Sequence, residues 1–98
     1  MTFLTKLKNK WNEGKFVCVG LDSSDFNLNK SVIDQTFDLV CCYKPNSAFY
    51  EAAGVVGLEN LKKTVSYIHE KDPDMPVILD AKRADIGNTN EEYAKAVF

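Results

Sequence analysis

The class of fold is indicated by residues 16–21, which read FVCVGL. This run is continuously apolar and contains β-branched residues, which is typical of a strand buried on both faces of a parallel sheet. Two further runs of the same kind follow, at residues 39–43 (LVCCY) and residues 76–79 (PVIL). Helical patterns separate the three runs. The chain therefore predicts an α/β fold in which strand–helix units build a parallel sheet.

The expected helices are defined by apolar residues at helical spacing and by the residues that stop them. They cover an N-terminal segment that ends before Gly14, residues 28–36, residues 46–53, a longer segment that reaches the break at Asp72-Pro73, and residues 88–98. In the second of these helices we expect Val32 and Ile33 to point inward. Asn88 or Thr89 is the expected cap of the last helix.

Composition narrows the class of protein. The 98 residues are 45% hydrophobic and 27% charged, which is enough to bury the core of one small domain and excludes disorder. The net charge of -2 gives no basic footprint for nucleic acid. There is no apolar run of about 18 residues, so we expect no membrane segment. Lysines interrupt the N-terminus, which therefore does not resemble a secretory signal.

The cysteines favour a reducing compartment. Cys18, Cys41 and Cys42 all lie in apolar runs, and no CxxC pair occurs. We expect buried or half-buried free thiols, and a cytoplasmic protein. Since Cys41 and Cys42 are neighbours in a predicted strand, their side chains should point to opposite faces and should not share a metal ion.

Charged residues follow the predicted strands. Asp22 ends the first, Lys44 ends the second, and Asp80 and Lys82 end the third, with Asp85 three residues further on. Right-handed crossovers place the carboxyl ends of all parallel strands at one edge of the sheet, where α/β proteins carry their active sites. Asp80 and Lys82, two residues apart, should share a face. Two interpretations remain open: an active site and a solvated loop.

The chemistry that suits such a cluster follows from its alternating charges. An adjacent carboxylate keeps an ammonium protonated. A fixed ammonium beside a fixed carboxylate can protonate a carbanion that forms where an anionic group departs. The residues alone favour an active site without deciding the reaction.

Residues 80–89, which read DAKRADIGNT, resemble the signature of the orotidine 5'-phosphate decarboxylase family. The upstream segments 20–22 (GLD) and 43–46 (YKPN) match the first two strand ends of that family in the same order. The resemblance implies a TIM (β/α)8 barrel, of which this chain covers about the first three βα units. Residues 1–98 would then be the N-terminal part of a single barrel domain, with no second domain.

The resemblance also implies an activity, the decarboxylation of orotidine 5'-phosphate to uridine 5'-phosphate in de novo pyrimidine biosynthesis, without a metal or organic cofactor. By resemblance, Lys82 is the proton donor and Asp80 lies against the substrate carboxylate. Lys44 flanks Asp80 and bonds a ribose hydroxyl, and Asp22 accepts from the ribose hydroxyls.

The resemblance further implies a homodimer with shared active sites. The loop that would cross into the partner's site contains Asp85, Ile86 and Thr89, of which Asp85 is counted with the catalytic residues and the other two with the substrate contacts. No nucleic-acid or membrane partner is expected. For three other residues the expected roles are structural: a salt bridge for Arg83, a helix cap for Asn46 and a helix C-terminal contact for His69.

Length separates this chain from a whole barrel, which typically has about 250 residues. In this family the residues that hold the 5'-phosphate come from later strands, so we expect the 98 residues alone to be inactive or nearly so. Two alternatives stay open. One is a magnesium-dependent keto-sugar phosphate decarboxylase of the same superfamily, and the other is a non-catalytic half-barrel that acts as a fragment or interaction module.

Overall fold

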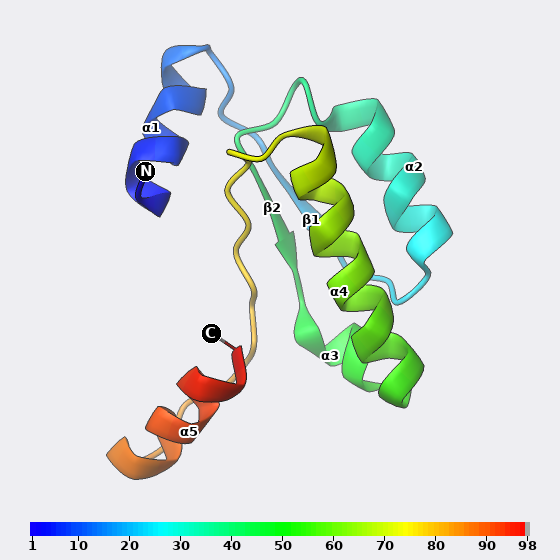
Figure 1. The fold of residues 1–98 in the computed structure, drawn as a ribbon, viewed down its shortest axis with the longest axis vertical. Helices are drawn as coiled ribbons and strands as arrows, with labels where there is room; N and C mark the ends of the chain where they lie inside the picture. The colour runs from blue at the N-terminus through cyan, green and yellow to red at the C-terminus, as the bar shows by residue number, and fades with distance from the viewer. Residues whose placement is uncertain (98) are drawn as a thin grey trace.

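The computed structural model describes residues 1–97, and its centre is a short parallel sheet (Figure 1). Strand β1 (Cys18–Leu21) pairs with β2 (Cys42–Pro45) in parallel, with Cys18 opposite Cys42 and Gly20 opposite Lys44. Both strands begin later than the apolar runs predicted. Lys44 and Pro45 accordingly lie inside β2 and not beyond its end.

The third predicted strand is reduced to two isolated parallel bridges, Tyr43 with Val77 and Asn46 with Asp80. Pro45 gives the physical reason. The N–H groups of Tyr43 and Ser47 donate to the carbonyls of residues 76 and 80, but the residue midway between them, Pro45, has no N–H to donate. The ladder is therefore interrupted, although residues 76–80 still run alongside β2.

The described residues 1–97 also form five helices. They are α1 (Phe3–Asn12), α2 (Phe26–Thr36), α3 (Ser47–Glu51), α4 (Gly54–Lys71) and α5 (Gly87–Val97). The side chain of Asp25 caps α2 by accepting from the N–H groups of residues 27 and 28, so this helix starts two residues earlier than expected. The expected cap by Asn46 is confirmed, since its side chain accepts from the N–H of Ala48.

The start of α5 differs from the expectation. Because the helix begins at Gly87, Asn88 and Thr89 lie inside its first turn and neither is its cap. The segment before it is closed instead by a pair of hydrogen bonds between Asp85 and Asn90. Phe98, the last residue of the predicted helix, lies outside the described residues.

The core lies between the sheet and the α2–α4 pair, which covers one face of it (Figure 1). It is formed by Leu21, Ile33, Val40, Tyr43, Ile68 and Met75. The inward direction of Ile33 and Val32 is thus confirmed, with Ile33 fully buried. Side chains alternate along a strand, so Gly20 and Lys44 lie on the opposite, uncovered face.

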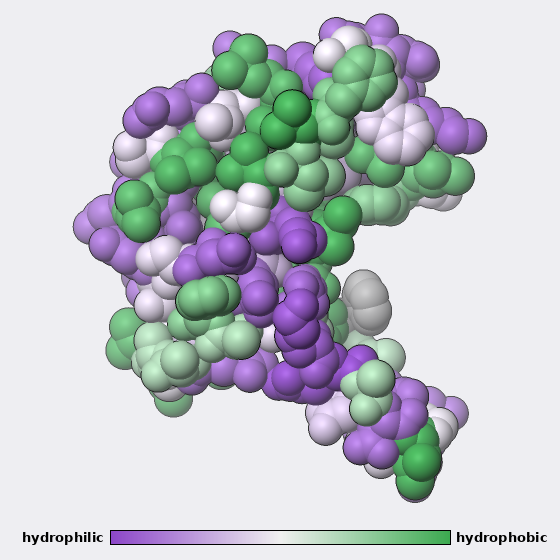
Figure 2. Space-filling model, turned by 180° about the vertical axis from the view of Figure 1, so that it is seen from behind, coloured by the Kyte–Doolittle hydropathy of each residue, from purple (hydrophilic) through white to green (hydrophobic). Residues whose placement is uncertain are grey.

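The uncovered face changes character along the strands. Phe16 and Ile78 are exposed apolar residues nearer the amino ends, while Lys44 and Asp80 lie towards the carboxyl ends. Seen from behind, hydrophobic residues gather in the middle of the upper half, with hydrophilic residues along its edges, and hydrophilic residues dominate the part that leads down to α5 (Figure 2). The polar end is the one that carries the predicted site.

The expectation for the cysteines is only partly met. Cys41 and Cys42 are buried, but Cys18 is exposed. The sulfur atoms of Cys41 and Cys42 lie 3.8 Å apart, which contradicts the expected opposite faces, because Cys41 precedes β2 and is not part of its regular alternation. Burial, with further contributions from the neighbouring thiols Cys18 and Cys41, raises the pKa of Cys42.

Helix α1 is anchored by a charged residue. Lys10 is only 8% exposed and forms an ion pair with Asp72, the residue that follows α4. Burial opposes ionisation of Asp72, but the hydrogen bonds from Lys10 and from the N–H of Asp74, with the charges of Lys10 and Lys15, leave its pKa lowered. None of the helices over residues 1–97 has the length and apolar character needed to cross a membrane.

Candidate active site

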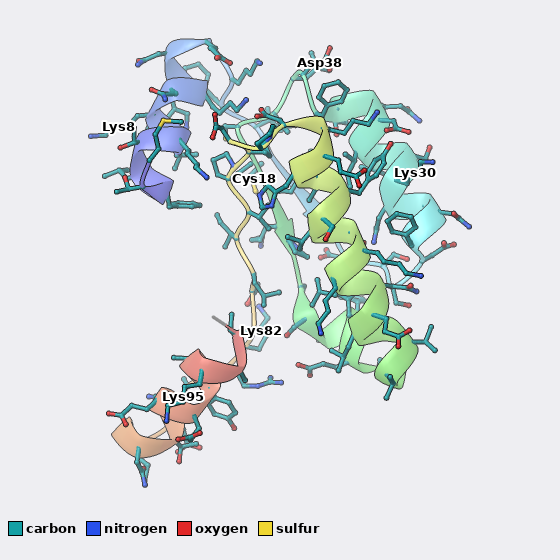
Figure 3. The ribbon with its side chains drawn as sticks, viewed as in Figure 1. Lys8, Cys18, Lys30, Asp38, Lys82 and Lys95 are labelled. Carbon is teal, nitrogen blue, oxygen red and sulfur yellow. The ribbon has the colours of Figure 1, made fainter. Side chains whose placement is uncertain are left out.

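The predicted residues come from three neighbouring segments of the sheet. Asp22 follows β1, Lys44 lies in β2, and Asp80 is bridged to Asn46 at the end of the third segment. Figure 3 shows Lys82 at the end of this extended segment, before the chain turns into α5. The parallel register thus brings these strand ends to one edge of the sheet.

Asp22 turns back over the uncovered face. A Cβ atom added at Gly20 would lie 3.5 Å from Oδ2 of Asp22, so the carboxylate lies above Gly20. Gly20 in turn is the register partner of Lys44. Because Gly20 has no side chain, the surface between Asp22 and Lys44 is left open to a ligand group.

Asp80 and Lys82 are in direct contact, with 2.5 Å between Nζ of Lys82 and Oδ2 of Asp80. The contact does not arise from the extended geometry that the sequence suggested. Lys82 has a φ of 54°, in the left-handed region that residues with a side chain rarely adopt. At this residue the chain leaves its extended course, and Nζ of Lys82 lies against the carboxylate of Asp80. Such strained residues are concentrated at functional sites.

The lysines set the ionisation of Asp80. The hydrogen bond from Lys82 lowers the pKa of Asp80, burial raises it less, and the charges of Lys82 and Lys44 lower it further. Lys44 is therefore near enough to act on Asp80 by its charge, although residues 1–97 contain no ion pair that includes it. Asp80 is consequently held as a carboxylate by its contact with Lys82 and, to a smaller extent, by the charge of Lys44.

Asp85 is not brought to this pair. Its Oδ1 accepts from the N–H of Ile86 at 2.8 Å, and its own N–H donates to Oδ1 of Asn90 at 2.7 Å. Ile86 is 68% exposed, and Thr89 lies in the first turn of α5. The alternating row that the sequence suggested therefore contains Lys44, Asp80 and Lys82 within this chain, while Asp85 belongs to the loop that leads to α5.

The structural role expected for Arg83 is confirmed. Its guanidinium pairs with Glu51 at the end of α3 and donates to the carbonyl of Ala81. It also lies over the ring of Tyr93, 5.5 Å from the centroid. Arg83 thus connects the loop after Lys82 to both α3 and α5. His69 contacts the carbonyl of Met75 at 3.1 Å, just beyond the end of its helix.

A cavity of about 610 Å³ lies between α4 and α5. Its lining is mainly apolar, with Leu58, Leu61 and Val65 from α4 and Ala96 and Val97 from α5. None of the predicted site residues lines it. This cavity lies on the helix side of the sheet and is separate from the charged cluster.

Sequence reasoning missed a buried polar group beneath Asp22. Asn29 in α2 and Tyr50 in α3 are both almost fully buried and bond to each other. The signal was present for Asn29, which precedes the buried Ile33 by four residues and so occupies an inward position with a polar side chain. Tyr50 gave no such signal, because a tyrosine in a short helix is most simply a core residue.

Comparison with known proteins agrees with this geometry. Residues 15–98 match the family model described as the orotidine 5'-phosphate decarboxylase / HUMPS family. The chain belongs to this family. It is 50% identical over 97 residues to the orotidine 5'-phosphate decarboxylase of Flavobacterium johnsoniae, and 48% identical over 97 residues to that of Christiangramia forsetii. Each alignment covers 85% of this chain and 36% of the relative. The chain therefore spans little more than a third of these curated relatives.

Solved structures show the same relationship. The chain aligns over its full length (100%) with 40% of the Leishmania donovani OMP decarboxylase, with a TM-score of 0.89 and 34% identity. With the orotidine 5'-monophosphate decarboxylase of Plasmodium berghei the TM-score is 0.82 at 25% identity, covering 99% of this chain and 49% of that one. These structures confirm the predicted fold class, an α/β barrel of which the chain forms a part.

Proposed function

We propose that the complete protein decarboxylates orotidine 5'-phosphate to uridine 5'-phosphate in pyrimidine biosynthesis. The observation that carries the proposal is the contact between Lys82 and Asp80, with Lys44 close enough to act on the same carboxylate. Asp80 and Lys82 lie inside residues 80–89, which resemble the family signature, and Lys44 lies in the upstream match at residues 43–46. The names of the relatives support the same reaction.

The proposed chemistry follows from the charges of this pair. The bond between the pyrimidine ring and the substrate carboxylate breaks, carbon dioxide leaves, and the electron pair stays on the ring carbon. Lys82 then delivers a proton from Nζ to that carbon. Its positive charge also stabilises the negative charge as it develops. Asp80, kept ionised by the lysines, pairs with Nζ of Lys82 and faces the position of the departing carboxylate.

The remaining residues bind the ribose or complete the site of a partner subunit, and Asp85 is counted with the catalytic residues. We place the ribose hydroxyls between Asp22 and Lys44, over the open surface of Gly20. Asp85, Ile86 and Thr89 would complete the site of a partner subunit in a homodimer. Two observations support this assignment: Asp85 does not join the Asp80–Lys82 pair of its own chain, and Ile86 is exposed. The free cysteines support a cytoplasmic location.

Replacing the proton donor tests the proposal. In the complete protein we expect Lys82→Ala to lower kcat by about a hundredfold to ten thousandfold, which is the usual contribution of a positioned general acid. Affinity for uridine 5'-phosphate should change much less. The matched control is Lys63→Ala, which removes an exposed lysine of α4. Near-normal turnover of Lys82→Ala would show that the proton donor is wrongly assigned.

A chelator separates the proposal from the magnesium-dependent alternative, in which a keto-sugar phosphate would be the substrate. We expect turnover of orotidine 5'-phosphate to survive treatment with EDTA. Loss of activity that returns with Mg²⁺ would favour the alternative.

A non-catalytic module would neither turn over nor bind the nucleotide. Titration with uridine 5'-phosphate measures this binding.

A further inference from the structure

The loop that carries Asp22 is held by side chains from three helices. Three of its backbone carbonyls, on both sides of Asp22, each accept a hydrogen bond from a side chain. The donors are Oη of Tyr50 to Leu21 at 2.9 Å, Nδ2 of Asn29 to Ser23 at 2.9 Å, and Nδ2 of Asn60 to Ser24 at 2.8 Å. They come from α3, α2 and α4 respectively.

Two of these donors, Asn29 and Tyr50, form one buried network with Thr64, which connects it to the backbone of Asn60. Nδ2 of Asn29 lies 3.1 Å from Oη of Tyr50 and 3.3 Å from Oγ1 of Thr64. Thr64 in turn donates to the carbonyl of Asn60 at 2.7 Å. Asn29, Tyr50 and Thr64 are all at most 2% exposed. Buried polar groups are costly unless they are bonded, so each member depends on the others and on the loop carbonyls.

The carboxylate of Asp22 stands outside this network. Asp22 is exposed and lies over Gly20, on the uncovered face of the sheet. The backbone on both sides of it is therefore fixed from below, while its oxygens remain available from above. This is how a binding carboxylate is preorganised: the support locks the backbone and leaves the ligand-facing atoms free.

From this arrangement we infer that Tyr50, Asn29 and Asn60 are positioning residues that hold Asp22 where it meets the ribose hydroxyls. The inference rests on the proposed function, which supplies the ribose. It adds that recognition of the sugar depends on helices α2, α3 and α4 through hydrogen bonds to the loop. None of these side chains touches the nucleotide.

The test uses Tyr50→Phe in the complete protein, which removes the hydroxyl that donates to Leu21 and keeps the ring. Tyr43→Phe is the matched control. Tyr43 is equally buried, and its hydroxyl contacts Thr36 at 2.6 Å and the carbonyl of Ile33 at 3.4 Å, at the far end of α2. Asn60→Ala is a second variant at a less buried position, should Tyr50→Phe fold poorly.

The first measurement is hydrogen exchange of the peptide that contains residues 21–25, which does not depend on activity. We expect faster exchange in Tyr50→Phe and in Asn60→Ala, and no change in Tyr43→Phe. Unchanged exchange in both loop variants would overturn the inference that the network fixes the loop.

The second measurement compares the Kd of uridine 5'-phosphate with those of its 2'-deoxy and 3'-deoxy analogues. In the wild type, loss of the hydroxyl that meets Asp22 should weaken binding about tenfold or more. Tyr50→Phe should reduce this penalty about threefold or more, because the contact is already loosened. A penalty that stays as in the wild type would overturn the positioning role. If the wild type neither turns over nor binds the nucleotide, the proposed function is wrong, and so is the role in positioning Asp22 for the ribose. The exchange data would still show whether the network fixes the loop.

Discussion

At Lys82 the backbone and the side chain act together. The left-handed φ of 54° costs about 1–3 kcal/mol in a residue with a side chain, and such a cost persists only where the surroundings impose it. Here it turns Nζ back onto Asp80. The closeness of these two residues was predictable from their spacing, but the turn that achieves it was not, because no local pattern distinguishes Lys82 from an extended residue.

The ionisation of Asp80 gives a prediction at this scale. In Lys82→Ala we expect the pKa of Asp80 to rise, because the hydrogen bond from Lys82 is the largest contribution to its lowering. Lys44→Ala should raise it less, since Lys44 acts only through its charge. Carbon NMR of the labelled carboxyl as a function of pH measures both. An equal rise in the two variants would mean that the hydrogen bond is not the main cause.

Asp85 marks the limit of prediction for the site. Its place three residues after Lys82 suggested that its side chain could reach back to Lys82. The side chain of Asn90 instead holds the backbone of Asp85, by bonding to its N–H and its carbonyl. That partner lies in the following helix, and its side-chain geometry is not visible in a spacing. Arg83 was easier, because a side chain next to Lys82 must point away from the site.

At the scale of the elements, the positions of the two strands could be predicted from the apolar runs. One proline interrupts the pairing of β2 with the third segment. The runs at residues 16–21 and 39–43 located β1 and β2 to within a few residues. The interruption beside β2 arises because Pro45 lacks an N–H. That consequence could have been read from the sequence, whereas the contact between the sulfur atoms of Cys41 and Cys42 could not, because it depends on where the strand begins.

The close packing of α3 against α4 leaves no room for a side chain at Gly57, so we expect substitution there to destabilise the protein. A Cβ atom there would lie 1.8 Å from the carbonyl oxygen of Tyr50 and 2.8 Å from Cβ of Ala53. Gly57→Ala should therefore destabilise the protein by about 1–3 kcal/mol or more through overpacking. Gly87→Ala is the matched control, since a Cβ there meets nothing within 4 Å. Urea unfolding compares the two, and equal stability would show that the helices can separate freely.

The anchor of α1 gives a pH-dependent prediction. Lys10→Met should cost about 1.5–3 kcal/mol, because it leaves a partly buried Asp72 carboxylate without its charged donor. The pKa of Asp72 is lowered in the folded state, so the stability from this pair is present above the ordinary carboxyl pKa and is lost as the pH falls through the lowered one. Urea unfolding across acidic pH should show this loss in the wild type and not in Lys10→Met. Lys8→Met, on the same helix, should behave like the wild type.

As a whole, the molecule measures 39 × 30 × 18 Å and is flat and open for its size. Helix α5 lies apart from the sheet, joined to the rest by the loop that contains Asp85 and Ile86 (Figure 1). The fold class and the family could be predicted from strand–helix alternation and from the motifs at the strand ends. The homodimer stays a prediction that rests on the family resemblance, because hydropathy patterns and spacing within one chain do not show which residues meet a second copy.

Shared active sites can be tested by mixing two variants of the complete protein. Lys82→Ala and Asp85→Ala should each have very low activity alone. If Asp85 acts across the dimer interface, subunit exchange creates hybrids in which one site has both residues intact, and about a quarter of the sites become active. Recovered activity on mixing is the expected result. No recovery, with exchange demonstrated by mass spectrometry, would place Asp85 in the site of its own chain.

The ion pair between Lys10 and Asp72 has a consequence for the order of events on the ribosome. The two residues are 62 positions apart, and chains grow at about 5–20 residues per second. For several seconds α1 therefore exists before Asp72 has been synthesised. Since Lys10 is the one buried residue of α1, few other contacts can hold the helix in place. Helix α1 can therefore form this ion pair only after α4 and Asp72 have been synthesised.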